Sequence, residues 1–192
     1  MIRRGPSSAR AMGLWGMDTL EKICQSPQTR LDVWPSLLDN QMNAEVRLRN
    51  VEPNDLPIFF EQQLDPDATR MAEFPARDRA SFDAHWEKNI LGNPDAINQT
   101  ILVDGEVAGN IGSWPQDGVR LVGYWIGKEY WGKGVATHAL AAFLHLVTDR
   151  PLHAHVAKHN AGSIRVLEKC GFTLEQRGEV AGDGVELVLV LR

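Results

Sequence analysis

The chain has 192 residues, 43% of them hydrophobic and 23% charged, which is enough apolar sequence to bury one substantial core. Its net charge of -5 disfavours a general nucleic-acid binder, and no apolar run approaches the roughly 18 residues that span a bilayer. Two distant cysteines, Cys24 and Cys170, exclude a disulfide framework and suit a reducing compartment. We therefore predict a cytoplasmic protein without membrane or nucleic-acid partners, present as a monomer or homodimer.

Residues 1–43 differ from the rest of the sequence. They open on Gly5-Pro6-Ser7-Ser8, their apolar periodicity is patchy, and they contain no strand pattern. Either they form an arm that packs on the domain, or translation begins at Met42. We predict an N-terminal appendage over 1–43, partly ordered or an alternative-start extension, and one folded domain over 44–192.

The first half of that domain is predicted to hold a strand and two helices. The strand covers 46–51, and Pro53 suits the first turn of a helix that runs to about Leu64. Apolar residues at four-residue spacing predict a second helix near 81–91. The segment between the helices, 64–80, is expected to be a loop.

Three strands follow in the middle of the chain. Residues 101–103 and 106–108 flank Asp104-Gly105, a pair that tolerates the positive φ angles of a two-residue hairpin turn. Another strand at 121–126 leads through a glycine-rich turn into a helix. Its apolar residues share one face: Val135, Leu140, Phe143, Leu144 and Val147.

The C-terminal part is predicted as strand, helix, strand, strand. The first strand is 153–157, and a helix over 161–170 lies between Asn160 as its N-cap and Gly171 as its terminator. Residues 185–191 form the last strand. The order is β-α-α-β-β-β-α-β-α-β-β.

The glycine-rich turn over 132–137 is predicted to bind an anion. It joins a strand to a helix, so free backbone N–H groups gather at the helix N-terminus. Gly132, Gly134 and Ala136 let a phosphate approach the main chain closely, and Lys133 adds positive charge. These residues alone leave the phosphate ligand open.

Two common phosphate-binding loops fit this segment poorly. Residues 127–133 match G-x-x-x-x-G-K, but Gly134 stands where a Ser or Thr would bind magnesium. Residues 132–137 resemble G-x-G-x-x-G, yet the last position is Thr137 and the turn does not open a βαβ unit. Neither a nucleoside triphosphatase nor a dinucleotide-binding protein is predicted.

Three sequence blocks together resemble the GNAT superfamily of N-acetyltransferases. Residues 131–136 match its pyrophosphate pattern Q/R-x-x-G-x-G/A except at Trp131, a residue tolerated in branches similar to the ribosomal-protein alanine acetyltransferases. Gly123-Tyr124-Trp125-Ile126 lies upstream, and Asn160-x-x-Ser163 followed by 168–172 lies downstream. The resemblance covers about 45–192. It implies an α/β GNAT fold, with a mixed, mostly antiparallel seven-stranded sheet and about four flanking helices, that moves an acetyl group from acetyl-CoA to a primary amine.

The resemblance also implies how acetyl-CoA is held. The strand ending at Ile126 would splay from the next strand and pair its backbone with the pantetheine amides. The pyrophosphate would rest on backbone amides of the turn. Asn160 either caps its helix only or also contacts the cofactor arm. The implied pyrophosphate contacts are Lys133, Gly134, Val135, Ala136 and Thr137.

Catalytic roles carry over less completely. Ser163 resembles the serine proposed to protonate the leaving thiolate in related enzymes, although a plain first-turn helix position is the interpretation that its place favours. The tyrosine that many relatives use is replaced by Leu167, and a strand glutamate is replaced by Leu121. The loop carboxylates Glu73, Asp67 and Asp117 are the remaining candidates, and among them we predict Glu73 as the general base.

The histidines, the acceptor and an alternative function need separate predictions. His153, His155 and His159 lack an acidic or cysteine partner at suitable spacing, so no metal is predicted. The acceptor is a protein N-terminus or a small-molecule amine, and the order of the 64–80 segment is expected to distinguish an open groove from a closed pocket. A CoA-binding sensor without turnover is the alternative function.

Overall fold

The computed structural model describes residues 44–179 and 185–192. The strands in that part of the chain are β1 (Val46–Asn50), β2 (Ile97–Val103), β3 (Glu106–Gln116), β4 (Val119–Ile126), β5 (Leu152–Ala157), β6 (Thr173–Glu179) and β7 (Val185–Leu191). The α-helices are α4 (Leu56–Gln63), α5 (Pro66–Ala72), α6 (Arg79–His85), α7 (Val135–Phe143) and α8 (Ala161–Lys169). Short 3-10 helices cover Pro53–Asp55 and Lys128–Tyr130, and a π-helix covers Trp86–Leu91. The predicted appendage over 1–43 lies outside the described residues.

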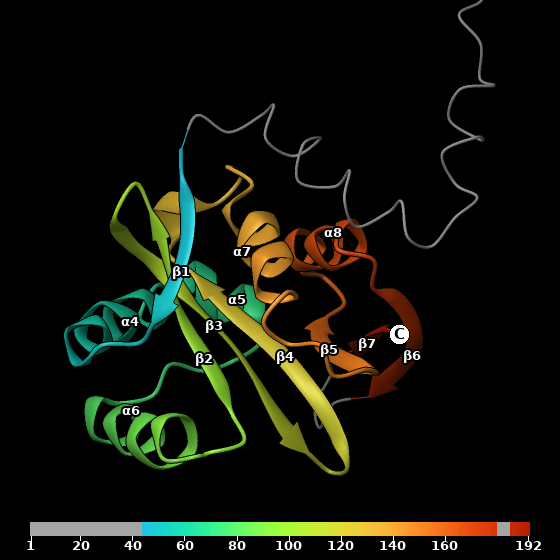
Figure 1. Ribbon diagram of the computed structural model, residues 1–192, viewed down its shortest axis with the longest axis horizontal. Helices are drawn as coiled ribbons and strands as arrows, with labels where there is room; N and C mark the ends of the chain where they lie inside the picture. The colour runs from blue at the N-terminus through green and yellow to red at the C-terminus, as the bar shows by residue number, and fades with distance from the viewer. Residues whose placement is uncertain (1–43, 180–184) are drawn as a thin grey trace, which may run out of the picture. The chain divides into compact units, whose positions relative to one another are not determined.

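The seven strands form one sheet in the order β1-β2-β3-β4-β5-β7-β6 (Figure 1). Every neighbouring pair is antiparallel except β4 and β5. The mixed, mostly antiparallel sheet of the prediction is therefore confirmed. The last strand along the chain, β7, lies between β5 and β6, so the edge strands are β1 and β6.

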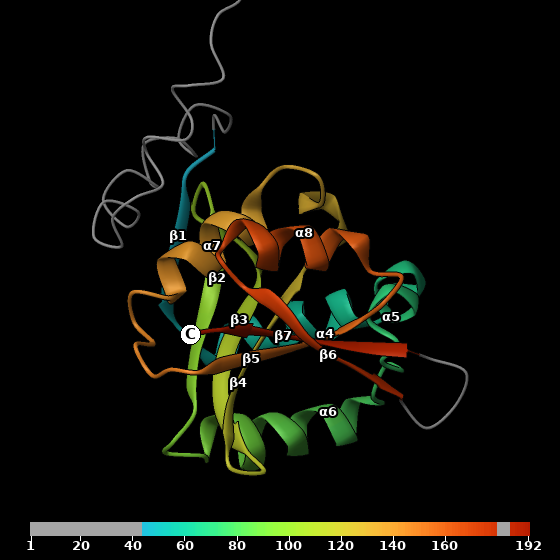
Figure 2. The same ribbon diagram turned by 90° about the vertical axis from the view of Figure 1, so that its right-hand side faces the viewer.

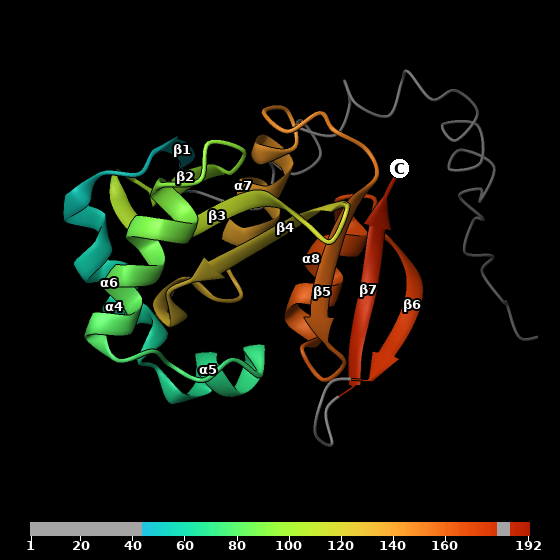
Figure 3. The same ribbon diagram turned by 90° about the horizontal axis from the view of Figure 1, so that it is seen from below.

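Strands β4 and β5 pair over only two positions. Arg120 lies opposite Leu152 and Leu121 opposite His153, after which the strands diverge (Figure 3). The Gly127 N–H donates to the Ala108 carbonyl of β3 at 2.9 Å. Because strand residues alternate in direction, the backbone groups of alternate residues of β4 then face the gap beside β5. The splay implied by the sequence resemblance is present.

Helices cover both faces of the sheet. Helices α7 and α8 lie on one face and α6 on the other, with the strands between them (Figure 2). The larger core includes Val135, Leu140, Phe143 and Val147, so the predicted apolar face is buried, although α7 itself ends at Phe143. A smaller aromatic cluster of Phe59, Phe82 and Trp86 packs beneath the other face.

Two parts of the prediction need correction. The segment 64–80 is not a plain loop, because it contains α5, which Asp65 caps by accepting the backbone N–H of Asp67 at 2.8 Å. The central hairpin strands, 97–103 and 106–116, are also longer than predicted. A bulge between Ile101 and Leu102 interrupts the alternation of side chains there, which hides the full length of the strand from a sequence pattern. The structure has five α-helices among its described residues, one more than predicted.

Candidate active site

The gap between β4 and β5 opens into a cavity of about 580 Å³. Four segments line it: the end of β4, the glycine turn with the start of α7, the inner side of α5, and α8 with the residue before it. Side chains or backbone that contribute to the lining include Ala68, Met71, Ala72, Tyr124, Trp125, Ile126, Trp131, Gly134, Val135, Ala136, Thr137, Asn160, Ser163, Arg165 and Lys169.

The glycine turn presents uncapped amides to this cavity. Gly132 and Gly134 have φ angles of 72° and 78°, a backbone conformation that other residues adopt only with strain. Gly134 directly precedes α7, and no described side chain caps the first-turn N–H groups there. These donors and the positive helix end favour an anion. Gly134, Val135, Ala136 and Thr137, four of the five predicted pyrophosphate contacts, line the cavity.

Lys133, the fifth, is not part of the cavity lining. Its ammonium lies 5.8 Å from the centre of the Tyr130 ring, and the side chain is exposed. Positive charge in the cavity lining comes instead from Arg165 and Lys169, two exposed residues one turn apart on α8. Neither forms an ion pair with a described residue. Sequence reasoning missed this pair, although two cations at i and i+4 on one helix were a readable signal.

Asn160 caps α8, as predicted. Its Oδ1 accepts the Ser163 backbone N–H at 3.0 Å, while both residues line the cavity. The Ser163 carbonyl accepts the Tyr124 hydroxyl of β4 at 3.4 Å, so a phenol lies across the gap from β4 to α8. Burial raises the pKa of Tyr124, which keeps the phenol protonated at neutral pH.

The end of β4 carries a second bridging contact. The Trp131 indole N–H donates to the Ile126 carbonyl at 2.8 Å. This carbonyl was predicted to pair with a pantetheine amide, so the indole and the amide would share or compete for it. The Cys170 thiol, outside the cavity lining, lies 3.6 Å from the Thr137 carbonyl, and burial raises its pKa to about 12, which makes it a poor nucleophile.

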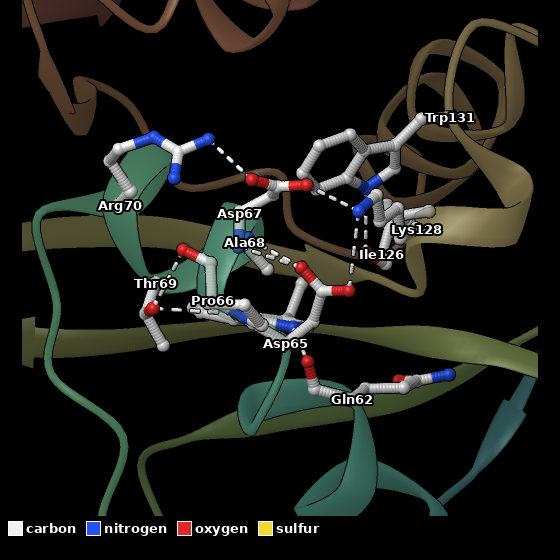
Figure 4. A network of polar contacts seen from close by, with 11 residues as sticks. Gln62, Asp65, Pro66, Asp67, Ala68, Thr69, Arg70, Ile126, Lys128 and Trp131 are labelled. Atoms are coloured by element: carbon white, nitrogen blue, oxygen red, sulfur yellow. Dashed lines mark hydrogen bonds and ion pairs between the residues drawn. The ribbon is translucent and has the colours of Figure 1, made fainter.

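Helix α5 forms one wall of the cavity and is tied down at its start. Ala68, Met71 and Ala72, which share one side of the helix, face the cavity. Lys128, just after β4, contacts the Asp67 carboxylate and lies 3.6 Å from that of Asp65 (Figure 4). The hydrogen bond from Lys128 lowers the pKa of Asp67, so this carboxylate is charged at neutral pH.

The end of α5 is tied to the loop before α8. Glu73 has a left-handed backbone with φ 51°, and its carboxylate lies 3.2 Å from Nδ1 of His159. Nε2 of His159 hydrogen bonds to the Arg70 carbonyl at 3.0 Å. Glu73 is not among the residues that line the cavity, whereas Ser163 is. The structure therefore does not bring the two predicted catalytic residues into one cluster.

The remaining sequence candidates lie elsewhere. Leu167 and Leu121 are buried. His153 and His155 lie 3.6 Å from Glu175 and 2.8 Å from Glu186, respectively, on the β5–β7–β6 part of the sheet. Within the described residues, no group of three or more potential ligands could hold a metal ion, and no helix is long and apolar enough to cross a membrane.

The family assignment follows from the sequence match to this domain. The family described as acetyltransferase (GNAT) domain matches residues 45–173, which span β1 to the start of β6 and include the whole cavity lining. The chain belongs to the GNAT acetyltransferases. No curated protein sequence matches it.

Solved structures share the fold at low sequence identity. The aminoglycoside acetyltransferase AAC(6′)-Ib with coenzyme A is 19% identical over 77% of this chain and 94% of its own, with a TM-score of 0.65. RimL, a ribosomal L7/L12 α-N-protein acetyltransferase, is 20% identical over 76% and 92%, with a TM-score of 0.63. A GNAT acetyltransferase from Bacillus anthracis is 20% identical over 78% and 96%, with a TM-score of 0.64.

Proposed function

We propose that the protein binds acetyl-CoA in the cavity between β4 and β5 and transfers the acetyl group directly to a primary amine. The observation that carries this proposal is the two-position pairing of parallel strands β4 and β5, which opens a gap beside an uncapped glycine turn. An extended arm with amide groups fits between unpaired strand edges, and a pyrophosphate fits on free helix amides. Structures of similar fold have been solved with coenzyme A, which agrees with this.

Different residues of the chain would bind different parts of acetyl-CoA. Backbone N–H groups from Lys133 to Thr137 would hold the pyrophosphate, and the side chains of Arg165 and Lys169 would complement its charge. The gap-facing backbone of Ile126 would pair with the pantetheine amides, and Asn160 would contact the arm with the amide nitrogen that the helix cap leaves available. The thioester supplies the activated acetyl group.

The reaction needs alignment and two proton transfers. The neutral amine attacks the thioester carbonyl carbon, a C–N bond forms and the C–S bond breaks, the nitrogen loses a proton, and the sulfur gains one. We assign Ser163 as the group that protonates the leaving sulfur, because Ser163 is a hydroxyl-bearing residue of the cavity lining. Glu73 stays the proposed base. Because Glu73 is not among the residues that line the cavity and lies 3.2 Å from His159, we expect it to take the proton through a water molecule.

For the acceptor we propose only a primary amine, on a protein N-terminus or a small molecule, and for the location the cytoplasm. One structure of similar fold was solved with the aminoglycoside ribostamycin, and another is named for a ribosomal protein N-terminus, so both kinds of amine occur on this fold. Direct use of acetyl-CoA and two separated cysteines suit the cytoplasm. A monomer or a homodimer is compatible with the proposal.

Free thiol release from acetyl-CoA tests the activity. The purified protein is incubated with acetyl-CoA and a panel of amines and N-terminal peptides, and thiol is followed against time. The proposal predicts release that depends on the added amine, with one acetylated product per thiol. Binding of acetyl-CoA without release across the panel would favour the CoA-binding sensor, and neither binding nor release would overturn the assignment.

A further inference from the structure

The cavity has two chemically different ends. The first is the glycine turn with Arg165 and Lys169 of α8. The second is bounded by α5, where Ala68, Met71 and Ala72 face inward, and by Tyr124 and Trp125 of β4. If the phosphates occupy the first end, the acetyl group and the incoming amine meet near the second. Apart from Ser163, whose carbonyl accepts the Tyr124 hydroxyl, the lining side chains there are apolar or aromatic.

No carboxylate lines this cavity among the described residues, and its only charged lining residues are Arg165 and Lys169. The carboxylates at the rim are already engaged. Asp65 caps α5 and Asp67 contacts Lys128, while Glu73 lies 3.2 Å from His159. Glu129, in the 3-10 turn after β4, lies against Gly127 and is likewise outside the lining.

We infer that the acceptor carries a single amine on an uncharged, largely apolar body, and that multiply cationic amines are poor substrates. The inference rests on the proposed function, whose acceptor it specifies. A second ammonium group entering this cavity would lose water without gaining a carboxylate partner among the described lining residues. The reacting amine escapes this cost because it enters neutral. An apolar substituent gains contacts with Met71 and Trp125 instead.

A matched pair of acceptors tests the inference. Hexylamine and 1,6-diaminohexane have the same carbon chain and differ by one amino group. At one pH, and after correction for the two reactive amines of the diamine, we expect kcat/KM to be at least roughly tenfold higher for hexylamine, the factor that one mismatched charge typically produces. Equal values, or faster turnover of the diamine, would overturn the inference while leaving the acetyltransferase intact.

A substitution on α5 should reverse the preference. Met71→Glu places a carboxylate on the cavity side of α5, so the diamine should gain several-fold relative to hexylamine. Thr69→Glu is the matched control, because it adds the same charge to the same helix at a residue outside the cavity lining. The inference fails if the two variants change the ratio equally.

The same assay separates this inference from the activity it rests on. Acetyl-CoA consumption with at least one of the two amines establishes the transferase, and the ratio then decides the acceptor class. If acetyl-CoA binds but neither amine nor any N-terminal peptide releases thiol, the transferase is refuted and the acceptor class falls with it.

Discussion

Single side chains decide how the proposed donor is held. Arg165 and Lys169 are exposed cations on α8 with no carboxylate partner in the described structure, in a protein whose net charge is negative. Because charge-assisted hydrogen bonds to phosphate are worth about 1.5–3 kcal/mol, removing either cation should weaken acetyl-CoA binding about tenfold or more. Calorimetry on Arg165→Ala and Lys169→Ala checks this, with Lys88→Ala on the far π-helix as the control. Equal affinities in all three would contradict the assignment.

A substitution at Ser163 tests proton transfer without changing acetyl-CoA binding. Its backbone N–H bonds to Asn160 in any case, so Ser163→Ala keeps the helix cap and removes only the hydroxyl. If the hydroxyl protonates the leaving sulfur, kcat should fall by about 10²-fold while the affinity for acetyl-CoA stays the same. Single-turnover kinetics measures the chemical step directly. An unchanged rate would leave Ser163 as a helix residue and point to the Tyr124 phenol.

At the scale of elements, α5 is a cavity wall fixed from both sides. Lys128 ties its start to the end of β4, and His159 ties its end to the loop before α8. The double variant Lys128→Ala, His159→Ala should therefore speed amide hydrogen exchange in α5 several-fold and raise KM for the acceptor more than for acetyl-CoA. Exchange in α7 serves as the internal control. Unchanged exchange in α5 would show that its apolar contacts alone hold it.

These elements also mark the limit of what the sequence predicts. The glycine turn, the Asn160 cap and most of the order of elements along the chain follow from local patterns, because caps, turns and periodicity involve residues close in sequence. Helix α5 was missed even though Asp65 and Pro66 signal a helix start, since seven residues carry little periodicity. The contacts Lys128–Asp67 and His159–Glu73 join segments far apart in the chain, so only the fold brings them together.

At the scale of the whole domain, a buried ion pair holds β1, β2 and the start of α4 together. Asp55 accepts two hydrogen bonds from Arg49, at 2.6 and 2.7 Å, and one from the Thr100 hydroxyl at 2.6 Å. Burial alone would raise the pKa of Asp55, but these donors outweigh it and the pKa is lowered. Its carboxylate therefore stabilises the fold above the unfolded value near pH 3.9, and this contribution is lost as pH falls through the lower folded pKa.

Asp55→Asn should thus destabilise the domain without touching the cavity. It leaves the Arg49 guanidinium without its anion. Because the Arg49 side chain is 30% exposed, the loss should be smaller than the about 3–5 kcal/mol typical of a fully buried pair. Urea unfolding at neutral pH should show this loss, and the difference from the wild type should shrink as the pH falls below about 4. If the loss in free energy of unfolding stayed constant down to acid pH, it would come from packing and not from the charge of Asp55.

The central claim is that acetyl-CoA lies between β4 and β5 with its pyrophosphate on the turn before α7. The most direct measurement is calorimetric titration of acetyl-CoA into the wild type, Gly134→Val and Gly118→Val. Both glycines have positive φ, 78° and 82°, so the backbone strain is matched, but Gly118 lies in the β3–β4 turn outside the cavity lining. We expect binding to be lost in Gly134→Val and kept in Gly118→Val. Normal affinity in Gly134→Val would place the cofactor elsewhere and contradict the account.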